Sequence, residues 1–320
     1  MTSLSNSARL LDGAGVARQI REELTPRVAA FTARFGRAPG LGIVLVGEDP
    51  ASQIYVRNKA RAGGEAGFWI DLHALPAATS LGDVLALVES LNRSERHDGI
   101  LVQSPLPEAM GEGAARRVFD TIDPAKDVDG FSAESVGRLV QNRPGLRSCT
   151  PAGIMELLDR YGIDPAGHHA VVIGRSDIVG KPMALMLLHR HATVTICHSR
   201  TPDLADTAAR ADILVAAIGR AGFVTPGFVK PGATVVDVGM NRLSDEADVR
   251  RFFGEGSPRV ADLARKGSVL IGDVHPGVAQ VAGALTPVPG GVGPLTVAML
   301  MKNTLAAGEA RAASGRRAGP

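Results

Sequence analysis

The stretch HHAVVIGRSDIVGKP (168–182) joins a short apolar segment to a glycine turn and the start of a helix. Its run of Val and Ile predicts a strand that is buried on both faces of a sheet. A strand that runs into glycine before a helix N-terminus offers free backbone N–H groups and the positive end of the helix dipole, and both suit a phosphate. Gly174 and Gly180 do not have the GxGxxG spacing, so an ordinary glycine-rich turn is the alternative.

Further apolar segments follow this turn and alternate with helical stretches. Because parallel strands need a crossover connection, helices between the strands predict parallel pairing. Thr150 as the N-cap and Pro151 as the first helical residue predict the start of a helix. We therefore expect a doubly wound parallel sheet in a domain over residues 151–285. Its predicted strands are HHAVVIG (168–174), ATVTICH (192–198), DILVAAIG (212–219) and ATVVDVG (233–239).

The end of the second strand in such a sheet lies near the ribose of a bound dinucleotide. This chain has Ser199 and Arg200 at that point, and Arg175 follows the first glycine of the turn. Ser and Arg suit the 2′-phosphate of NADP, whereas an acidic residue would bind the 2′-hydroxyl of NAD. A solvated surface arginine is the alternative.

The same alternation in the first half of the chain predicts a separate α/β lobe that ends near residue 150. One more helix, with a broad apolar face, is expected near the C-terminus, followed by a frayed tail. A polar segment marked by Gly and Pro, residues 244–268, is expected to be a surface excursion. The expected strands are 41–47, 69–75 and 98–103, the expected helices are 52–68, 81–93 and 294–308, and the tail is 309–320.

Composition excludes several classes of protein. The chain has 320 residues, of which 45% are hydrophobic and 21% charged, so disordered, collagen-like and coiled-coil proteins are excluded. A net charge of +2 points neither to a nucleic acid nor to a membrane surface as a partner. Two cysteines without a CxxC or HExxH motif predict neither a disulfide framework nor a metal site. No signal peptide or membrane-length apolar run is recognisable, so we expect a cytoplasmic protein.

Lysine is scarce in this chain: six of the 35 basic residues are Lys and 29 are Arg. Lys59 lies four residues after Tyr55, so the two share one face of the helix predicted there. A lysine sheltered in an apolar cleft can exchange a proton near neutral pH. An ordinary exposed helix pair is the alternative.

Three further motifs are candidates for parts of a functional site. Gln103, in LVQSPLP (101–107), follows a predicted strand at the carboxyl end of a sheet. The segment KDVDGF (126–131) has two carboxylates two residues apart, so one is expected to be structural and the other to face a ligand. The segment TPVPGGVGP (286–294) is a rigid loop that leads into the last helix.

Taken together and in this order, five segments resemble the family of bifunctional methylenetetrahydrofolate dehydrogenases/methenyltetrahydrofolate cyclohydrolases. The resemblance covers residues 8–308 and rests on YVRNK, LVQSPLP, KDVDGF, GRSDIVGKP and TPVPGGVGPLTVAML. It implies a catalytic folate-binding domain (1–150 with helix 294–308) and a Rossmann-type NADP domain (151–285). It also implies that the last helix returns to the first lobe, that the active site is the cleft between the lobes, and that the protein is a homodimer.

The resemblance assigns roles residue by residue. Lys59 corresponds to the catalytic lysine, Tyr55 to a tyrosine that packs on the folate, Gln103 to a glutamine beside the lysine, and Asp129 to an aspartate that binds the pterin. The implied NADP-binding residues are Gly174, Arg175, Ser176, Gly180, Ser199 and Arg200. The implied loop residues beside the substrate are Gly291, Pro294 and Thr296. Arg61, Ser104 and the long segment 244–270 depart from the family pattern.

The implied chemistry fits these residue types. Hydride transfer from 5,10-methylenetetrahydrofolate to NADP⁺ needs positioning more than acid–base catalysis. Water then adds to the methenyl cation, and Lys59 would activate this water or shuttle protons. A neutral amine is favoured there, because an ammonium would repel a cationic substrate. The alternatives are an NADP-dependent dehydrogenase of another small substrate and a protein that binds NADP without turnover.

Overall fold

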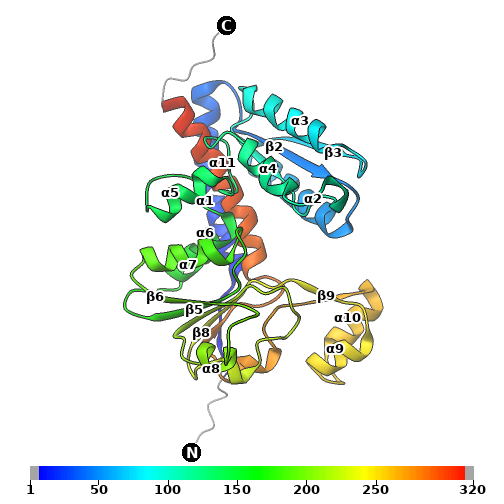
Figure 1. Ribbon diagram of the computed structural model, residues 1–320, viewed down its shortest axis with the longest axis vertical. Coiled ribbons are helices and arrows are strands. Elements are labelled where there is room, and N and C mark those ends of the chain that lie inside the picture. The colour runs from blue at the N-terminus through cyan, green and yellow to red at the C-terminus, as the bar shows by residue number, and fades with distance from the viewer. Residues whose placement is uncertain (1–6, 314–320) are drawn as a thin grey trace, which may run out of the picture. The chain divides into compact units, whose positions relative to one another are not determined.

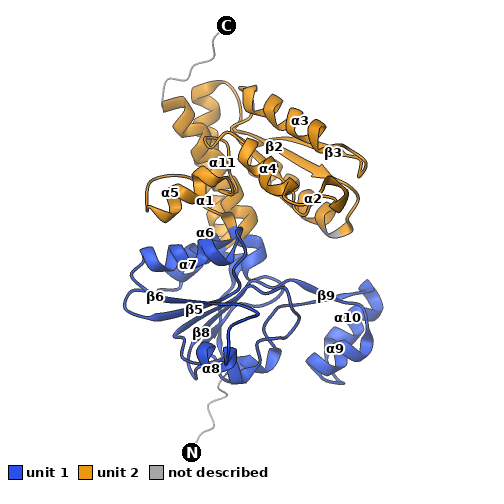
Figure 2. Cartoon of the chain, viewed as in Figure 1, with its two compact units in different colours: residues 1–16, 150–295 blue, residues 17–149, 296–320 orange. Residues whose placement is uncertain are grey.

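A computed structural model describes residues 7–313 of the chain and divides them into two compact units (Figure 2). Unit 1 contains residues 7–16 and 150–295, and unit 2 contains residues 17–149 and 296–313. We expected residues 1–150 to form one domain, but residues 7–16 belong to unit 1, together with the expected NADP-binding domain. The reason is strand pairing: β1 (Arg9–Leu10) pairs in parallel with β11 (Ala284–Leu285).

Unit 1 is built on a sheet to which β5, β6 and β8 belong (Figure 1). All its strands pair in parallel, in the order β1-β11-β8-β7-β5-β6. The four predicted strands are confirmed as β5 (His169–Ile173), β6 (Thr193–Cys197), β7 (Ile213–Ala216) and β8 (Thr234–Asp237). Most of α6 (Cys149–Arg160) and all of α7 (Gly180–His189) and α8 (Leu204–Ala208) lie in unit 1, with 3-10 turns at Pro226–Phe228 and Pro276–Gln280.

The continuous apolar runs of these strands supply two separate cores. Val171 and Leu214 belong to one buried cluster, whereas their chain neighbours Val172 and Val215 belong to another. Because successive side chains of a strand point to opposite faces, the two clusters cover opposite faces of the sheet. This burial explains why the strands do not alternate between apolar and polar residues. It confirms the doubly wound architecture.

Unit 2 contains a parallel three-stranded sheet with the order β3-β2-β4. Val84 and Leu91 of one helix and Val118 of another pack against strand residues on one face of this sheet. The strands are β2 (Gly40–Val46), β3 (Trp69–Leu75) and β4 (Gly99–Val102). The remaining elements are α1 (Gly13–Phe35), α2 (Pro50–Glu65), α3 (Leu81–Arg93), α4 (Ala114–Thr121), α5 (Ala133–Val140), α11 (Val292–Ala313) and a 3-10 turn at Glu108–Met110.

The last helix, α11, packs against the first lobe, as expected from the family resemblance. Asn303 donates hydrogen bonds from Nδ2 to the carbonyl oxygens of Val128 (2.8 Å) and Arg147 (2.9 Å). Thr304 is fully buried beside Gly99, where a Cβ would lie 3.2 Å from the threonine hydroxyl. The helix is longer than predicted, so residues 309–313 of the expected tail are helical, and residues 314–320 lie outside the described part.

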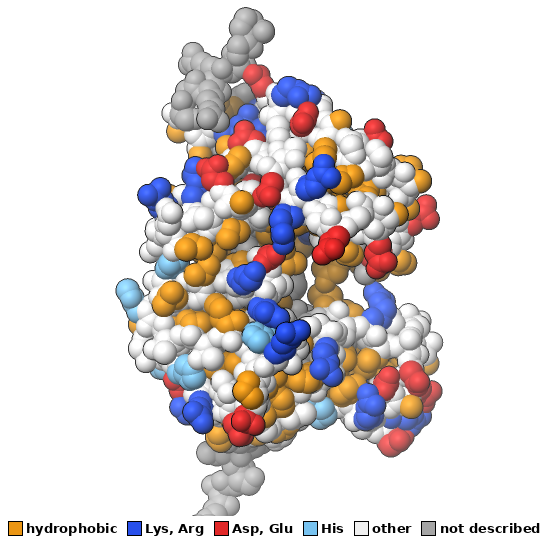
Figure 3. All heavy atoms as spheres, viewed as in Figure 1, with side chains coloured by type: hydrophobic (Ala, Val, Ile, Leu, Met, Phe, Trp, Pro, Cys, Tyr) orange, Lys and Arg blue, Asp and Glu red, His pale blue; other side chains and the backbone are white. Residues whose placement is uncertain are grey.

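The expected surface excursion is a folded element. Strands β9 (Asn241–Leu243) and β10 (Val269–Ile271) form an antiparallel pair that encloses α9 (Glu246–Phe253) and α10 (Pro258–Lys266). Apolar side chains of all four elements form a buried cluster. Each helix buries a single residue, Val249 or Leu263, and charged side chains of both signs cover the segment (Figure 3). Such short helices with so little apolar surface are hard to recognise in sequence.

No helix among residues 7–313 combines the length and the hydropathy that are needed to cross a membrane.

Lys126, to which the sequence assigned no chemistry, holds the end of α3. Its side chain is 1% exposed, and Nζ donates hydrogen bonds to the carbonyl oxygens of Leu91 (2.9 Å), Asn92 (2.7 Å) and Ser94 (2.6 Å). The last carbonyls of a helix have no intrahelical partners, and the ammonium supplies them. Burial lowers the pKa of Lys126 to about 8, so the ammonium form still dominates at neutral pH.

We expect Lys126→Met to lower the free energy of unfolding by about 3 kcal/mol, because it leaves buried carbonyl groups without donors. Guanidinium denaturation at neutral pH measures this change. Lys266→Met, at a lysine whose side chain is 56% exposed, is the matched control and should change the unfolding free energy by less than about 0.5 kcal/mol. Equal stabilities of the two variants would contradict the structural role of Lys126.

Candidate functional site

Lys59 is a buried lysine whose amine faces a glutamine. It lies on α2, which begins with Pro50 behind the cap Asp49, whose carboxylate accepts a hydrogen bond from the Ser52 N–H at 2.7 Å. The lysine is 8% exposed, and its Nζ donates a hydrogen bond to Oε1 of Gln103 at 3.0 Å. The predicted face of α2 is therefore partly buried and is not an ordinary exposed helix face.

Gln103 follows β4 directly and is held in one orientation. Its Nε2 donates a hydrogen bond to the carbonyl oxygen of Ser104 at 2.7 Å. Because the amide nitrogen is engaged there, the amide oxygen is left to face Lys59. Ser104, which departs from the family pattern, thus contributes its backbone to the orientation of Gln103. Tyr55, one helical turn before Lys59, is half-buried.

The two carboxylates of the 126–131 segment have different surroundings. Asp127 is fully buried and accepts hydrogen bonds from the backbone N–H groups of Phe131 (3.2 Å) and Ser132 (2.9 Å), so it shapes the loop. The Asp129 carboxylate interacts electrostatically with Lys59 and hydrogen bonds with Cys149. Burial raises the pKa of Asp129, and the charge of Lys59 opposes that shift.

Cys149 is a member of this cluster that the sequence did not single out. Its thiol is buried and donates a hydrogen bond to the carbonyl oxygen of Val128 at 3.2 Å. Burial, together with the neighbouring Asp129 charge, raises the pKa of Cys149 well above its usual value, so the thiol stays protonated. The feature of the sequence that could have identified Cys149 is its position next to Thr150, at the predicted start of a helix. Unit 2 thus brings together Lys59, Gln103, Asp129 and Cys149.

The 174–180 turn of unit 1 requires both of its glycines. Gly174 has a φ of +134°, and a Cβ there would lie 2.2 Å from the carbonyl oxygen of Ala217. A Cβ at Gly180 would lie 2.3 Å from the carbonyl oxygen of Gly174. The Ser176 hydroxyl accepts hydrogen bonds from the N–H groups of Val179 and Gly180, each at 3.2 Å, and so caps the start of α7.

The end of β6 lies beside this turn. The Gly174 N–H donates a hydrogen bond to the carbonyl oxygen of Cys197, the last residue of β6, at 2.9 Å. Chain order reverses at β5, which has β6 on one side and β7 on the other, so the turn lies at the topological switch point where α/β sheets bind ligands. Exposed residues on both segments, Arg175, Ser176, Ser199 and Arg200, are available to an anionic ligand.

One acidic residue also lies in the turn. Asp177 is exposed, but Lys181 forms an ion pair with its carboxylate from one helical turn away. This pairing offsets the negative charge that would otherwise repel a phosphate. The polar groups, the glycine turn and the exposed arginines fit a dinucleotide that carries an additional phosphate on its ribose.

The predicted loop residues near the last helix fall into both units. Gly291 and Pro294 belong to unit 1, whereas Thr296 is half-buried in unit 2. A Cβ at Gly291 would lie 2.5 Å from the carbonyl oxygen of Pro287, so this loop is closely packed against itself. The division between the units falls inside α11, after Leu295.

Comparisons with known proteins agree over almost the whole chain. Two family models match: the catalytic domain of tetrahydrofolate dehydrogenase/cyclohydrolase over residues 11–129, and its NAD(P)-binding domain over residues 148–312. The bifunctional protein FolD of Solibacter usitatus is 55% identical over 305 residues, which are 95% of this chain and 98% of that protein. The FolD protein of Koribacter versatilis is 54% identical over 304 residues, again 95% and 98%.

Solved structures give the same result. The bifunctional methylenetetrahydrofolate dehydrogenase/cyclohydrolase FolD of Campylobacter jejuni has a TM-score of 0.85 at 38% identity and covers 95% of this chain and 100% of its own. The FolD of Trypanosoma brucei, solved in complex with NADP cofactor and an inhibitor, also has a TM-score of 0.85 at 38% identity, with coverages of 97% and 99%.

Proposed function

The chain belongs to the tetrahydrofolate dehydrogenase/cyclohydrolase family, and we propose that Lys59, held by Gln103, performs the proton transfers of its hydrolytic step while the 174–180 turn binds NADP. The protein is a bifunctional enzyme of one-carbon metabolism. It oxidises 5,10-methylenetetrahydrofolate to 5,10-methenyltetrahydrofolate with NADP⁺ and hydrolyses the product to 10-formyltetrahydrofolate. The observation that carries the roles proposed for Lys59 and Gln103 is the hydrogen bond of 3.0 Å from the buried Lys59 amine to Oε1 of Gln103.

The residues of unit 1 bind the cofactor. When bound, NADP⁺ supplies the acceptor for the hydride that leaves the methylene carbon. Gly174 and Gly180 let the backbone approach the pyrophosphate, and the start of α7 offers it the positive end of a helix dipole. Arg175, Ser199 and Arg200 hold the 2′-phosphate, because a guanidinium and a hydroxyl both donate hydrogen bonds to its oxygens.

Hydrolysis requires the movement of protons, and Lys59 is placed to move them. Water attacks the methenyl carbon, and the Lys59 amine takes the proton that the attacking oxygen releases. The bond from this carbon to N5 of the folate then breaks, and the ammonium returns the proton to N5, which leaves the formyl group on N10. Gln103 holds the amine through its Oε1 throughout. One proton is released to solvent for each turnover.

Asp129 and Tyr55 bind the folate in this proposal. The Asp129 carboxylate accepts hydrogen bonds from N–H groups of the pterin ring, and Tyr55 packs its ring against the substrate. Asp127 is excluded from that role, because its oxygens accept hydrogen bonds from the backbone of its own loop. Gly291, Pro294 and Thr296 line the substrate near its reacting carbon.

The family resemblance also leads us to propose that the protein is a cytoplasmic homodimer. Light scattering coupled to size-exclusion chromatography measures the mass in solution, and a mass equal to one chain would contradict the dimer.

We expect Lys59→Ala to slow the hydrolysis of methenyltetrahydrofolate by at least about 100-fold, because the variant lacks the group that transfers protons. Lys59→Arg should be as slow, since arginine does not release its proton. The dehydrogenase rate should stay within a few-fold of the wild-type rate, because hydride transfer needs no proton from Lys59. Decay of the methenyl absorption and formation of NADPH measure the two rates.

The exposed lysine at position 266 provides the control, and Lys266→Ala should leave both rates unchanged. Hydrolysis by Lys59→Ala at the wild-type rate would show that the catalytic assignment is wrong.

The raised pKa of Asp129 predicts a pH dependence of folate binding. A carboxyl with a raised pKa is protonated at pH values where an ordinary aspartate is still ionised, and protonation removes its strength as an acceptor. The KM for methylenetetrahydrofolate should therefore rise as the pH falls, and the rise should begin at pH values where an ordinary aspartate is still ionised. Asp129→Asn should have a high KM with little pH dependence, whereas Asp248→Asn, at an exposed site on α9, should keep the wild-type profile. A wild-type profile in Asp129→Asn would contradict the role of Asp129.

We expect Arg175→Ala to weaken NADP⁺ binding by at least about 10-fold and to leave NAD⁺ binding almost unchanged, because only NADP⁺ carries the 2′-phosphate. Titration of the protein with each cofactor measures the two dissociation constants. Arg210→Ala removes another exposed arginine of unit 1 and serves as the control. Equal losses for both cofactors would rule out contact between Arg175 and the 2′-phosphate.

A further inference from the structure

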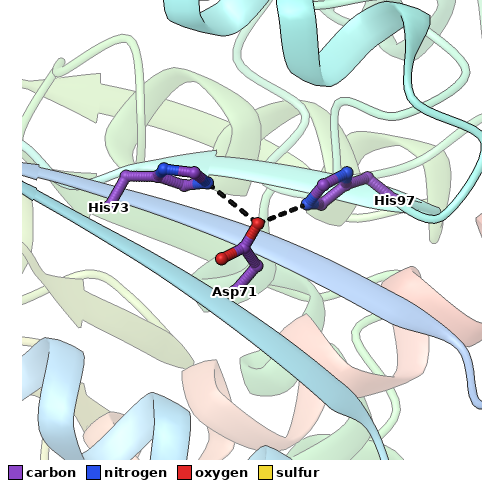
Figure 4. A group of neighbouring side chains, drawn as sticks. All are labelled: Asp71, His73 and His97. Carbon is purple, nitrogen blue, oxygen red and sulfur yellow. Dashed lines mark hydrogen bonds and ion pairs between the residues drawn. The ribbon is translucent and has the colours of Figure 1, made fainter.

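Three side chains of unit 2 that have no role in either reaction converge on one point (Figure 4). Asp71 and His73 lie two residues apart on β3 and so project from the same face of the strand, and His97 precedes β4. Oδ2 of Asp71 is 3.0 Å from Nε2 of His73 and 3.1 Å from Nε2 of His97. All three of these atoms lie within 4.8 Å of one another.

The orientation of His97 is set by its surroundings. Gly42, the partner of Asp71 on the neighbouring strand β2, leaves room for the ring: a Cβ there would lie 3.0 Å from Cδ2 of His97. Nδ1 of His97 is 2.7 Å from the Ser94 hydroxyl, so the other ring nitrogen, Nε2, is the one that faces Asp71. The ring of Trp69 packs beside it, with the ring centres 5.0 Å apart.

We propose that Asp71, His73 and His97 bind a zinc ion through Oδ2 and the two Nε2 atoms. Two imidazoles and one carboxylate form a donor set that zinc takes in proteins, with a fourth position left for water. Ligand bonds of about 2.0–2.1 Å in a tetrahedral site place neighbouring ligand atoms about 3.3 Å apart, close to the observed oxygen–nitrogen distances. The contact between Nδ1 of His97 and the Ser94 hydroxyl supplies the outer hydrogen-bond partner that a metal-binding histidine usually has.

The cluster is accessible to an ion from solvent. His97 is nearly buried, with 6% of its side chain exposed, whereas Asp71 and His73 are 33% and 27% exposed. An ion can therefore enter from the side of Asp71 and His73 and retain a water molecule. The ion would link the edge strand β3 to the segment that leads into β4, and it would replace the two hydrogen bonds that Asp71 accepts without metal. The sequence predicted no metal site because these ligands do not form a contiguous motif.

Untagged protein titrated with Co²⁺, and then with Zn²⁺ in competition, tests this proposal. Co²⁺ should give the visible absorption bands of a four-coordinate site at one ion per chain, without the charge-transfer band of a thiolate ligand. Zn²⁺ should abolish these bands, bind with a dissociation constant in the micromolar range or below, and raise the melting temperature. His73→Asn should weaken Zn²⁺ binding by at least about 100-fold.

The matched control is His191→Asn, because His191 is exposed and has a φ of +63°, which asparagine tolerates. This variant should bind Zn²⁺ as the wild type does. The proposal is overturned if the wild-type protein shows no visible Co²⁺ bands, or if His73→Asn binds Zn²⁺ as tightly as the wild type. The wild-type titration decides even if His73→Asn does not fold, and neither measurement depends on the two enzyme activities.

Discussion

Parallel strand pairing is the constraint on which both units depend. In each of the two main sheets of the described chain, neighbouring strands run in the same direction, so their carboxyl ends lie along one edge. Gln103 follows β4 at such an edge, and the 174–180 turn follows β5 at another. The residues that carry the chemistry are thus held at strand ends by a rigid sheet, and the connecting helices supply the groups that face them, as α2 supplies Lys59.

Two of the six lysines, Lys59 and Lys126, have surroundings that explain why a lysine stands at each position. Lys59 and Lys126 are both buried in unit 2, yet their amines have different partners. Lys126 donates to backbone carbonyls at the end of a helix, and all its hydrogen-bonding capacity is used there. Lys59 donates to the amide oxygen of Gln103 and interacts electrostatically with the Asp129 carboxylate, and both of these side chains can also contact a ligand. Burial alone therefore does not distinguish a catalytic lysine from a structural one.

The same distinction applies to the acids of the 126–131 segment. The sequence indicated that Asp127 and Asp129 would face different surroundings, because alternate residues point in opposite directions. It did not indicate which of them shapes the loop. Backbone N–H groups from residues further along the chain engage Asp127, and the start of α6 brings Cys149 to Asp129. Those contacts depend on the path of the chain after Gly130 and could not be read from the spacing.

The sequence by itself determined the two parallel sheets, the glycine turn and the identity of most candidate site residues. Periodicity, strand-ending glycines and local motifs are properties of short segments, so they can be recognised without knowledge of the fold. Tertiary structure alone decided the rest. It placed residues 9–10 beside β11, folded the 244–268 segment around a small apolar cluster, and brought His97 to Asp71 and His73. In each case the partners are far apart in the chain, and only packing brings them within contact distance.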